Sequence, residues 1–293
     1  MEIEIKLLLN DPKQISELAQ CRWPGALSVI TRSDLGNCYF DTPDLALRRL
    51  DMGLRIRRSG EQREQTLKTR GRVVGGLHAR PEYNVPIGSD HPDLSQFPET
   101  LWTPGQCQGI QQQLFAQFQT DFMRESARLR WQGSEVELAL DKGQIHAGAL
   151  SDPINELELE LVQGDPAVLL DLTEQLMTAQ PLRLGLDSKA ARGYRLAGLQ
   201  PEAEIVTQWA DEPGALLHAW QRNEARLMAG ELAAAEPLGR VLQAQSEQAP
   251  WMRALLSEFD LRPRQALTQL QADRRYGLAQ LTLLRQLLSS DSE

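Results

Sequence analysis

The sequence predicts an α+β protein in which a mostly β first part precedes a purely helical second part. Up to about Leu199, short segments alternate apolar and polar residues with the period of two that is typical of half-buried strands. From about Pro201 onward, apolar residues recur at helical spacing instead. The chain has 293 residues, more than one domain usually holds. We therefore expect one domain over residues 1–200 and a smaller helical one over 201–293.

The first part contains strand-like segments, two helix starts and one long loop. Asp11-Pro12 and Asp165-Pro166 each place a capping aspartate before a proline, which predicts helices outside the sheet. The segment Gly88–Gly109 holds three prolines and predicts a surface loop, and Gly75-Gly76 predicts a hairpin connection. The predicted strands are Glu2–Leu9, Asn37–Asp41, Gly53–Arg58, Gln62–Arg70, Ala79–Ile87, Phe122–Trp131, Glu135–Leu140, Gln144–Ala147 and Ile154–Val162.

Composition excludes several classes of protein. The chain begins with acidic residues where a secretory signal has basic ones, and it has no run of about 18 apolar residues. We therefore expect a cytoplasmic protein with no membrane partner. The three cysteines form no C-x-x-C pair, which argues against a disulfide framework and a zinc site. A net charge of -9 argues against nucleic acid as a partner, so an anionic ligand needs a local basic cluster.

Charged residues occupy alternate strand positions and are grouped by sign. Glu156, Glu158 and Glu160 share one strand face, and so do Arg55 and Arg57 on another strand. A half-solvated sheet explains any single strand of this kind. Across the whole set, however, rows of carboxylates are typical ligands of hard divalent cations, and arginines with lysines suit phosphate oxygens. The pattern favours a site for a metal ion and a polyphosphate.

An ordered set of motifs runs through the first part: Glu2-Ile3-Glu4-Ile5-Lys6, Tyr39-Phe40-Asp41-Thr42, Leu54-Arg55-Ile56-Arg57, Thr66-Leu67-Lys68-Thr69-Arg70-Gly71, Gly75-Gly76-Leu77 with Arg80-Pro81-Glu82-Tyr83, Glu137-Leu138-Ala139-Leu140-Asp141-Lys142-Gly143, Glu156-Leu157-Glu158-Leu159-Glu160-Leu161 and Ser188-Lys189. Together these motifs resemble the CYTH family. The resemblance implies an eight-stranded antiparallel β-barrel, open as a tunnel, with charged side chains inside and helices outside. The helical part is similar to a short or diverged CHAD domain, which is linked to CYTH domains in bacteria.

The family resemblance implies an enzyme, a metal-dependent hydrolase of inorganic triphosphate that releases pyrophosphate and phosphate. The implied cofactor is Mg²⁺ or Mn²⁺. Thiamine triphosphatase and class IV adenylate cyclase are the alternative activities, and a tunnel that binds polyphosphate or a nucleotide without turnover is the alternative from another class. A protein or polyphosphate could be the partner of the C-terminal helices. Because every matched residue precedes Gln200, we expect residues 1–200 to carry the activity.

The resemblance also assigns roles to individual residues. Asn84 stands where related proteins often have an acid, and the spacing from Asp141 favours Arg124 over Arg128 and Arg130 as the basic residue of its strand. Catalysis would depend on Glu4, Lys6, Arg57 and Glu158. The phosphates would bind Lys6, Arg55, Arg57, Lys68, Arg80, Arg124 and Lys189, and the metal ligands would be Glu2, Glu4, Asp141, Glu156, Glu158 and Glu160.

Overall fold

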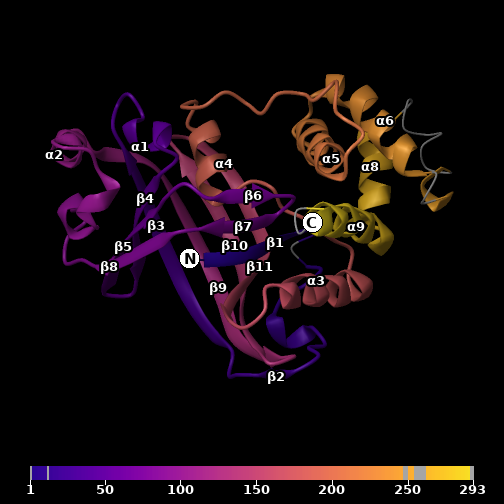
Figure 1. Ribbon diagram of the computed structural model, residues 1–293, viewed down its shortest axis with the longest axis horizontal. Helices are drawn as coiled ribbons and strands as arrows, with labels where there is room; N and C mark the ends of the chain where they lie inside the picture. Colours follow the sequence, from indigo (N-terminus) through magenta and orange to yellow (C-terminus); the bar gives the residue numbers. More distant parts are fainter. Residues whose placement is uncertain (1, 12, 247–249, 254–261, 291–293) are drawn as a thin grey trace.

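A curled antiparallel sheet forms the centre of the protein (Figure 1). The structure is a computed structural model that describes residues 2–11, 13–246, 250–253 and 262–290. Within these residues the sheet has twelve strands. Their bounds are β1 Glu2–Leu9, β2 Ala26–Leu27, β3 Thr31–Asp41, β4 Gly53–Ser59, β5 Gln62–Lys68, β6 Arg72–Val74, β7 Leu77–Arg80, β8 Glu82–Pro86, β9 Phe115–Trp131, β10 Ser134–Ala147, β11 Leu150–Gln163 and β12 Leu182–Leu184.

The sheet closes into a barrel through one long hairpin. The strands pair in the order β6-β7-β1-β11-β10-β9-β3-β4-β5-β8. One arm of this hairpin consists of β5 followed by β6, and the other arm consists of β7 followed by β8. The first arm pairs with β4 through β5, and the second arm pairs with β1 through β7, so the hairpin joins the two ends of the sheet. With each arm counted once, and the short β2 and β12 set aside, the described strands form a ring of eight. The predicted α+β class with a curled antiparallel barrel is confirmed, whereas the number of strands differs from the predicted eight because some arms are divided into short strands.

The strand predictions hold with local corrections. The segment Ala79–Ile87 is not one strand, because Pro81 lacks the N–H group that a continuous ladder needs. The two segments predicted within 135–147 are one strand, β10. β2, β6 and β12 have only two or three residues, too few to show an alternation in the sequence. The glycine pair Gly75-Gly76 forms the turn between β6 and β7 with positive φ angles of 55° and 105°, as a hairpin connection was expected there.

Two of the three non-strand predictions in the first part are wrong. Pro12 lies outside the described residues, and the residues that follow it form turns up to a 3-10 turn at Leu18–Gln20. The segment 88–109 is not a plain surface loop, because it buries Leu94 and Phe97 against Leu54 of β4. The helix start at Asp165 is confirmed, since the Ala167 N–H donates to the Asp165 carboxylate at 2.9 Å.

The helices lie outside the barrel, and none in the described residues is long and apolar enough to cross a membrane. Helix α3 packs beside α9 next to β1 and β11 (Figure 1). The helices are α1 Ala46–Arg49, α2 Gln106–Gln111, α3 Ala167–Ala179, α4 Lys189–Leu196, α5 Pro213–Met228, α6 Ala235–Ser246, α8 Pro263–Gln271 and α9 Arg274–Ser290. Further 3-10 turns occupy Leu94–Gln96, Glu99–Leu101, Leu232–Ala234 and Pro250–Met252.

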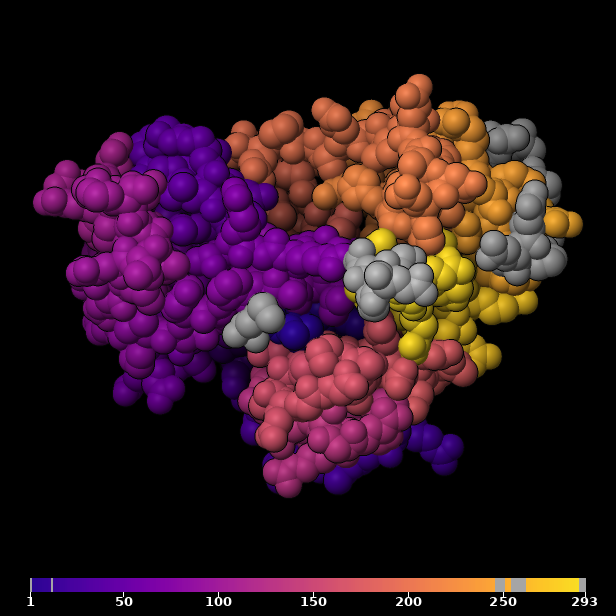
Figure 2. All heavy atoms as spheres, viewed as in Figure 1, coloured from indigo at the N-terminus to yellow at the C-terminus, as the bar shows by residue number. Residues whose placement is uncertain are grey.

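The C-terminal helices share their hydrophobic core with the barrel. Trp220 of α5 and Tyr276 of α9 are fully buried, with ring centroids 5.1 Å apart. The cluster that contains them also contains Ile5 and Leu7, which point outward from β1. Figure 2 shows the orange and yellow tail in continuous contact with the barrel. A boundary near residue 200 remains our proposal for the organisation of the sequence, but the packing does not separate the two parts.

Removal of the tail tests this packing. We expect a chain that ends at Gln200 to unfold at a lower temperature and to associate, because it exposes the apolar surface that α5 and α9 cover. Thermal unfolding and size-exclusion chromatography of the two lengths measure the effect. An equally stable, monomeric short chain would contradict the shared core.

Candidate active site

The interior of the barrel is a cavity of about 430 Å³. Its wall is the inner face of the strands, completed by α1 and α4. Most of its lining side chains are charged because the apolar half of each strand faces the outer core instead. The charged or polar lining residues are Glu2, Glu4, Lys6, Tyr39, Arg48, Arg55, Arg57, Glu64, Thr66, Lys68, His78, Arg80, Glu82, Asn84, Arg124, Glu137, Glu158, Glu160, Ser188, Lys189 and Tyr194.

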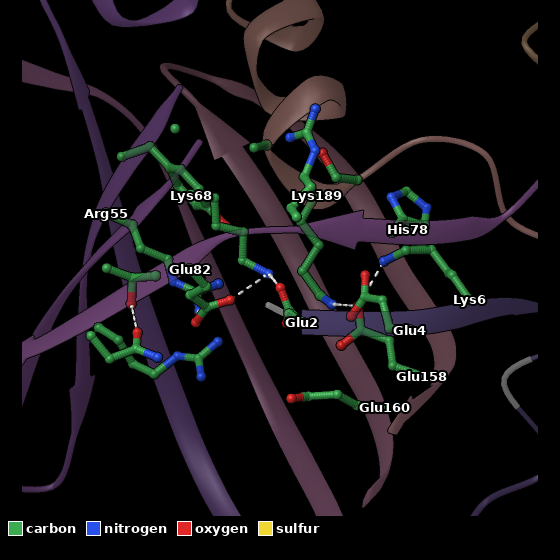
Figure 3. Close-up of a pocket in the computed structure, with 18 of the residues that line it drawn as sticks. Glu2, Glu4, Lys6, Arg55, Lys68, His78, Glu82, Glu158, Glu160 and Lys189 are labelled. Carbon is green, nitrogen blue, oxygen red and sulfur yellow. Dashed lines mark hydrogen bonds and ion pairs between the residues drawn. The ribbon is translucent and has the colours of Figure 1, made fainter. Parts of the chain in front are cut away.

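A row of glutamates crosses three neighbouring strands. Glu4 of β1 lies directly opposite Glu160 of β11, and Glu160 lies opposite Glu137 of β10. Like charges in direct register repel one another. Burial and the neighbouring charges of Glu137 and Glu4 raise the pKa of Glu160 to about 7. Figure 3 shows no interaction between Glu160 and the other residues drawn. Arg128 pairs with Glu137 at 2.6 Å, and a cation bound between Glu4 and Glu160 would relieve the repulsion between those two carboxylates.

A second pair of carboxylates lies toward the start of β1. Burial raises the pKa of Glu2 to about 8, and a hydrogen bond to Glu82 contributes to the rise. Lys68 bridges the pair, with its Nζ 2.5 Å from Glu2 and 2.9 Å from Glu82 (Figure 3). Glu82 has a lowered pKa, because Lys68 and Glu2 overcome the cost of its burial. The two acids thus share one lysine and a hydrogen bond.

At the other end of β1, three basic side chains interlock with three acids. Lys6 Nζ lies 2.7 Å from Glu156 and 2.6 Å from Glu158. Lys189 contacts the same two glutamates and lies 2.7 Å from Asp141. Burial disfavours the Glu158 carboxylate, but Lys189 and Lys6 overcome this and hold its pKa well below the usual range. The cluster is fixed from both sides before any ligand binds.

Arg124 completes this cluster from β9. Its Nε and Nη2 atoms donate to the two oxygens of Asp141 at 2.7 and 2.6 Å, and Nη2 also lies 2.7 Å from Glu158. Two donors on one carboxylate fix the plane of the guanidinium group. Burial opposes the charged form of Arg124, but Asp141 outweighs it and raises the pKa of the arginine.

Arginines crowd the opposite wall. Arg55 and Arg57 lie on β4, where Arg57 Nε donates to Asn37 at 2.9 Å. Burial, together with the charges of Arg55 and Arg124, lowers the pKa of Arg57 to about 9. A guanidinium with such a pKa is still protonated at neutral pH, but it lies among like charges. This wall therefore has the positive potential that a polyanion needs.

The structure brings together the site residues predicted from sequence. All the predicted phosphate-binding and catalytic residues line the cavity, as do Glu2, Glu4, Glu158 and Glu160 among the predicted ligands. Asp141 and Glu156 do not line it: both are 0% exposed behind Lys189. Of the three arginines on β9, Arg124 faces the cavity, whereas Arg128 and Arg130 pair with Glu137 and Glu135 and are more exposed.

Several lining residues escaped the sequence analysis. Arg48 and Tyr194 lie on helices α1 and α4, so the alternation of the strands gives no signal for them. His78 has the same parity as Arg80 on β7, and that spacing could have identified it. Its pKa is lowered by burial, which favours a neutral ring.

The donors present fit a hard divalent cation. One oxygen from each of Asp141, Glu156 and Glu158 lies within 4.8 Å of the others. Basic side chains already pair with that group, whereas burial and the charges of Glu137 and Glu4 raise the pKa of Glu160 on the neighbouring strand position. Oxygen donors from carboxylates are the usual ligands of Mg²⁺ and Mn²⁺.

A family model described as the CYTH domain matches residues 1–194. The chain belongs to the CYTH family. The CYTH match ends inside α4 and so includes every strand of the barrel and Lys189. The chain is 37% identical over 217 residues to a Haemophilus influenzae protein named inorganic triphosphatase. That alignment covers 72% of this chain and 59% of the length of the relative, so this chain spans less than two thirds of it.

Solved structures of related proteins are less similar. One is a candidate adenylyl cyclase from Hippeastrum, described as having a dominant triphosphatase activity, with 21% identity and a TM-score of 0.44. The alignment covers 69% of this CYTH chain and 98% of the Hippeastrum chain. Another is an inorganic triphosphatase with 24% identity and a TM-score of 0.23, covering 57% and 78% of the two chains.

Proposed function

We propose that this CYTH barrel hydrolyses inorganic triphosphate to pyrophosphate and phosphate with Mg²⁺ or Mn²⁺. The observation that carries the proposal is a cavity inside the barrel that is lined by charges of both signs. Among the described residues that line it are eight arginines and lysines and seven glutamates. A polyphosphate needs the bases and a divalent cation needs the acids. The similarity to the Haemophilus influenzae inorganic triphosphatase supports the same substrate.

The basic side chains would bind the phosphate oxygens. Lys6, Lys189 and Arg124 are already oriented by buried acids, so little reorganisation accompanies binding. Asp141 and Glu156 would position these cations from behind the wall. Arg55, Arg57 and Lys68 would contact the phosphates from the opposite wall, where Arg57 would neutralise charge that develops on the leaving pyrophosphate.

The carboxylates that face the cavity would hold the metal ion. In this proposal Glu4 and Glu160 are the main metal ligands, and Glu2 and Glu158 are additional ligands. The ion would supply Lewis-acid polarisation of phosphate oxygens. A remaining carboxylate of the glutamate row would accept a hydrogen bond from the water that attacks the terminal phosphorus, as the bond to the pyrophosphate oxygen breaks.

The alternative functions differ in what they require of the cavity. Thiamine triphosphatase and adenylate cyclase need room for an organic group, and a tunnel that only binds polyphosphate does not need seven glutamates. Phosphate release from inorganic triphosphate, thiamine triphosphate, ATP and pyrophosphate, each with Mg²⁺ and with Mn²⁺, separates them. We expect inorganic triphosphate to react fastest, and faster turnover of an organic triphosphate would overturn the choice of substrate. The cytoplasm remains the proposed location.

Replacement of Lys68 tests the basic wall. We expect Lys68→Ala to lower kcat/KM by about 2–4 kcal/mol, the usual effect of removing one oriented electrostatic donor. Added metal should not restore the activity, because the lost group binds phosphate rather than the ion. Steady-state kinetics across a metal titration measure both effects, and Arg49→Ala, on the outer side of α1, serves as control. Unchanged kcat/KM in folded Lys68→Ala would remove Lys68 from the site.

A further inference from the structure

The segment 184–187 runs from the end of β12 toward the start of α4 and connects two lysines of the cavity. The Gly185 N–H donates to the Lys6 carbonyl at 2.9 Å, and α4 begins at Lys189. A Cβ atom on Gly185 would lie 2.8 Å from Lys6 Cγ, so this backbone runs directly against the lysine side chain. Lys6 and Lys189 both point toward Glu158 (Figure 3). A shift of the segment would therefore move both ammonium groups.

Helix α5 of the C-terminal tail contacts this segment from outside the barrel. Gln221 is buried, and its Nε2 donates to the Leu184 carbonyl at 3.2 Å and to the Gly75 carbonyl at 3.3 Å. The Gly76 carbonyl of the same β6–β7 turn accepts from the Lys6 N–H at 3.0 Å. The side-chain amide of Gln221 thus joins the two stretches of backbone that bond to Lys6.

Arg222 of α5 contacts the end of the segment that leads to Lys189. Its Nη1 lies 2.9 and 3.2 Å from the two carboxylate oxygens of Asp187. Arg195 of α4 pairs with one of these oxygens at 2.6 Å, so Asp187 links α5 to α4. Asp187 directly precedes Ser188, whose side chain caps the N-terminus of α4. The tail therefore holds the chain two residues before Lys189.

Other contacts hold α4 farther from Lys189. The Tyr194 OH donates to Asp41 at 3.1 Å, and Arg192 pairs with Asp152 at 2.6 Å. Tyr194 and Arg192 lie about one turn beyond Lys189 in the helix. A phosphate that takes one of the three N–H donors of Lys189 also competes with the buried acids for them. The backbone before Lys189 therefore needs an anchor of its own, which α5 provides.

We propose that Gln221 and Arg222 are positioning residues of the active site. Through the segment 184–187 they hold Lys6 and Lys189 in the geometry that binds the phosphates. This inference rests on the proposed function for the role of the two lysines. The tail then takes part in the reaction, although every residue matched to the family lies before it. Misplacement of a binding group by about 1 Å can lower a rate about 100-fold.

Kinetics of Arg222→Ala in the full chain test the positioning. We expect kcat for triphosphate hydrolysis to fall at least about tenfold and KM to change less, because the other basic residues of the cavity still bind the substrate. Arg222→Lys should restore most of the activity, since one nitrogen makes both contacts to Asp187 and an ammonium group can do the same. Arg285→Ala is the matched control, because Arg285 joins the tail to Asp171 and Glu174 of α3 instead.

Hydrogen exchange measures the anchoring of α4 without any turnover. The Ala191 and Arg192 N–H groups of its first turn bond to Ser188. Mass spectrometry of fragments that span this turn should show faster exchange in Arg222→Ala than in the parent and in Arg285→Ala. A double substitution locates the contact that matters: when Asp187→Ala is already present, Arg222→Ala should cause no further loss of kcat.

The outcomes that overturn the positioning are distinct from failure of the enzyme. Unchanged exchange at the start of α4 in Arg222→Ala would show that α5 does not hold this helix. Faster exchange with an unchanged kcat would show that the anchor does not position the lysines for the reaction. An equal loss of activity in Arg285→Ala would assign the effect to general loosening of the tail. Absence of hydrolysis by the parent would contradict the proposed function, and the exchange rates would still decide whether α5 anchors α4.

Discussion

Glu4→Gln should lower kcat for triphosphate hydrolysis at least about 100-fold, since even residues that only support metal ligands cost 10–100-fold. The amide keeps the size and hydrogen bonding of the side chain but removes the charge that holds a divalent cation. Glu4 lies in register with Glu160, whose own pKa is raised to about 7 by burial and by acids that include Glu4. Raising the metal concentration should restore part of the activity.

Metal affinity provides a second measurement for the same variant. Mn²⁺ binding followed by electron paramagnetic resonance should weaken in Glu4→Gln. Glu135→Gln is the matched control, because Glu135 pairs with the exposed Arg130 and does not line the cavity. If both variants bind Mn²⁺ and hydrolyse triphosphate like the parent, the charged face is an ordinary solvated surface and the metal assignment is wrong.

Lys189→Met should have the largest effect on stability. Lys189 Nζ contacts Asp141 and Glu156, which are both fully buried. Removing one partner of a buried ion pair leaves an uncompensated charge and costs about 3–5 kcal/mol. Because the same ammonium would bind phosphate, kcat/KM should fall as well. Urea unfolding at neutral pH and steady-state kinetics at low temperature measure the two effects.

Lys68→Met separates the stabilisation of buried acids by a lysine from the binding of phosphate by a lysine. Lys68 is partly exposed and pairs with Glu2 and Glu82, which have more access to solvent than Asp141. We expect an activity loss similar to that of Lys189→Met with a smaller loss of unfolding free energy. Equal stability of the parent and Lys189→Met would show that Asp141 and Glu156 do not depend on the lysine, and the buried cluster would then have no positioning role.

The barrel could be predicted because its strands alternate so regularly. Both ends of the strand Glu2–Leu9 were predicted correctly, because Ile5 and Leu7 face a core of helices while Glu4 and Lys6 face the cavity. The break at Pro81 was missed because the flanking alternation continues through it. Short strands such as β12 pair through tertiary context and show no period of their own.

Site residues on strands could be predicted better than those on helices. Arg55 and Glu158 follow from alternation, but Arg48 reaches the cavity from α1, whose position depends on hydrogen bonds to Asp41. The sequence also could not separate acids that face the cavity from acids behind it. Asp141 and Glu158 have the same parity as cavity residues, and only the packing of Lys189 and Arg124 distinguishes them.

The most direct measurement is phosphorus NMR of tripolyphosphate incubated with the full chain and Mg²⁺ or Mn²⁺. The proposed function predicts that the triphosphate signals disappear as pyrophosphate and phosphate appear in equal amounts, and that a chelator stops the reaction. Triphosphate that stays intact with either metal, in folded protein, would contradict the assignment of this cavity to triphosphate hydrolysis.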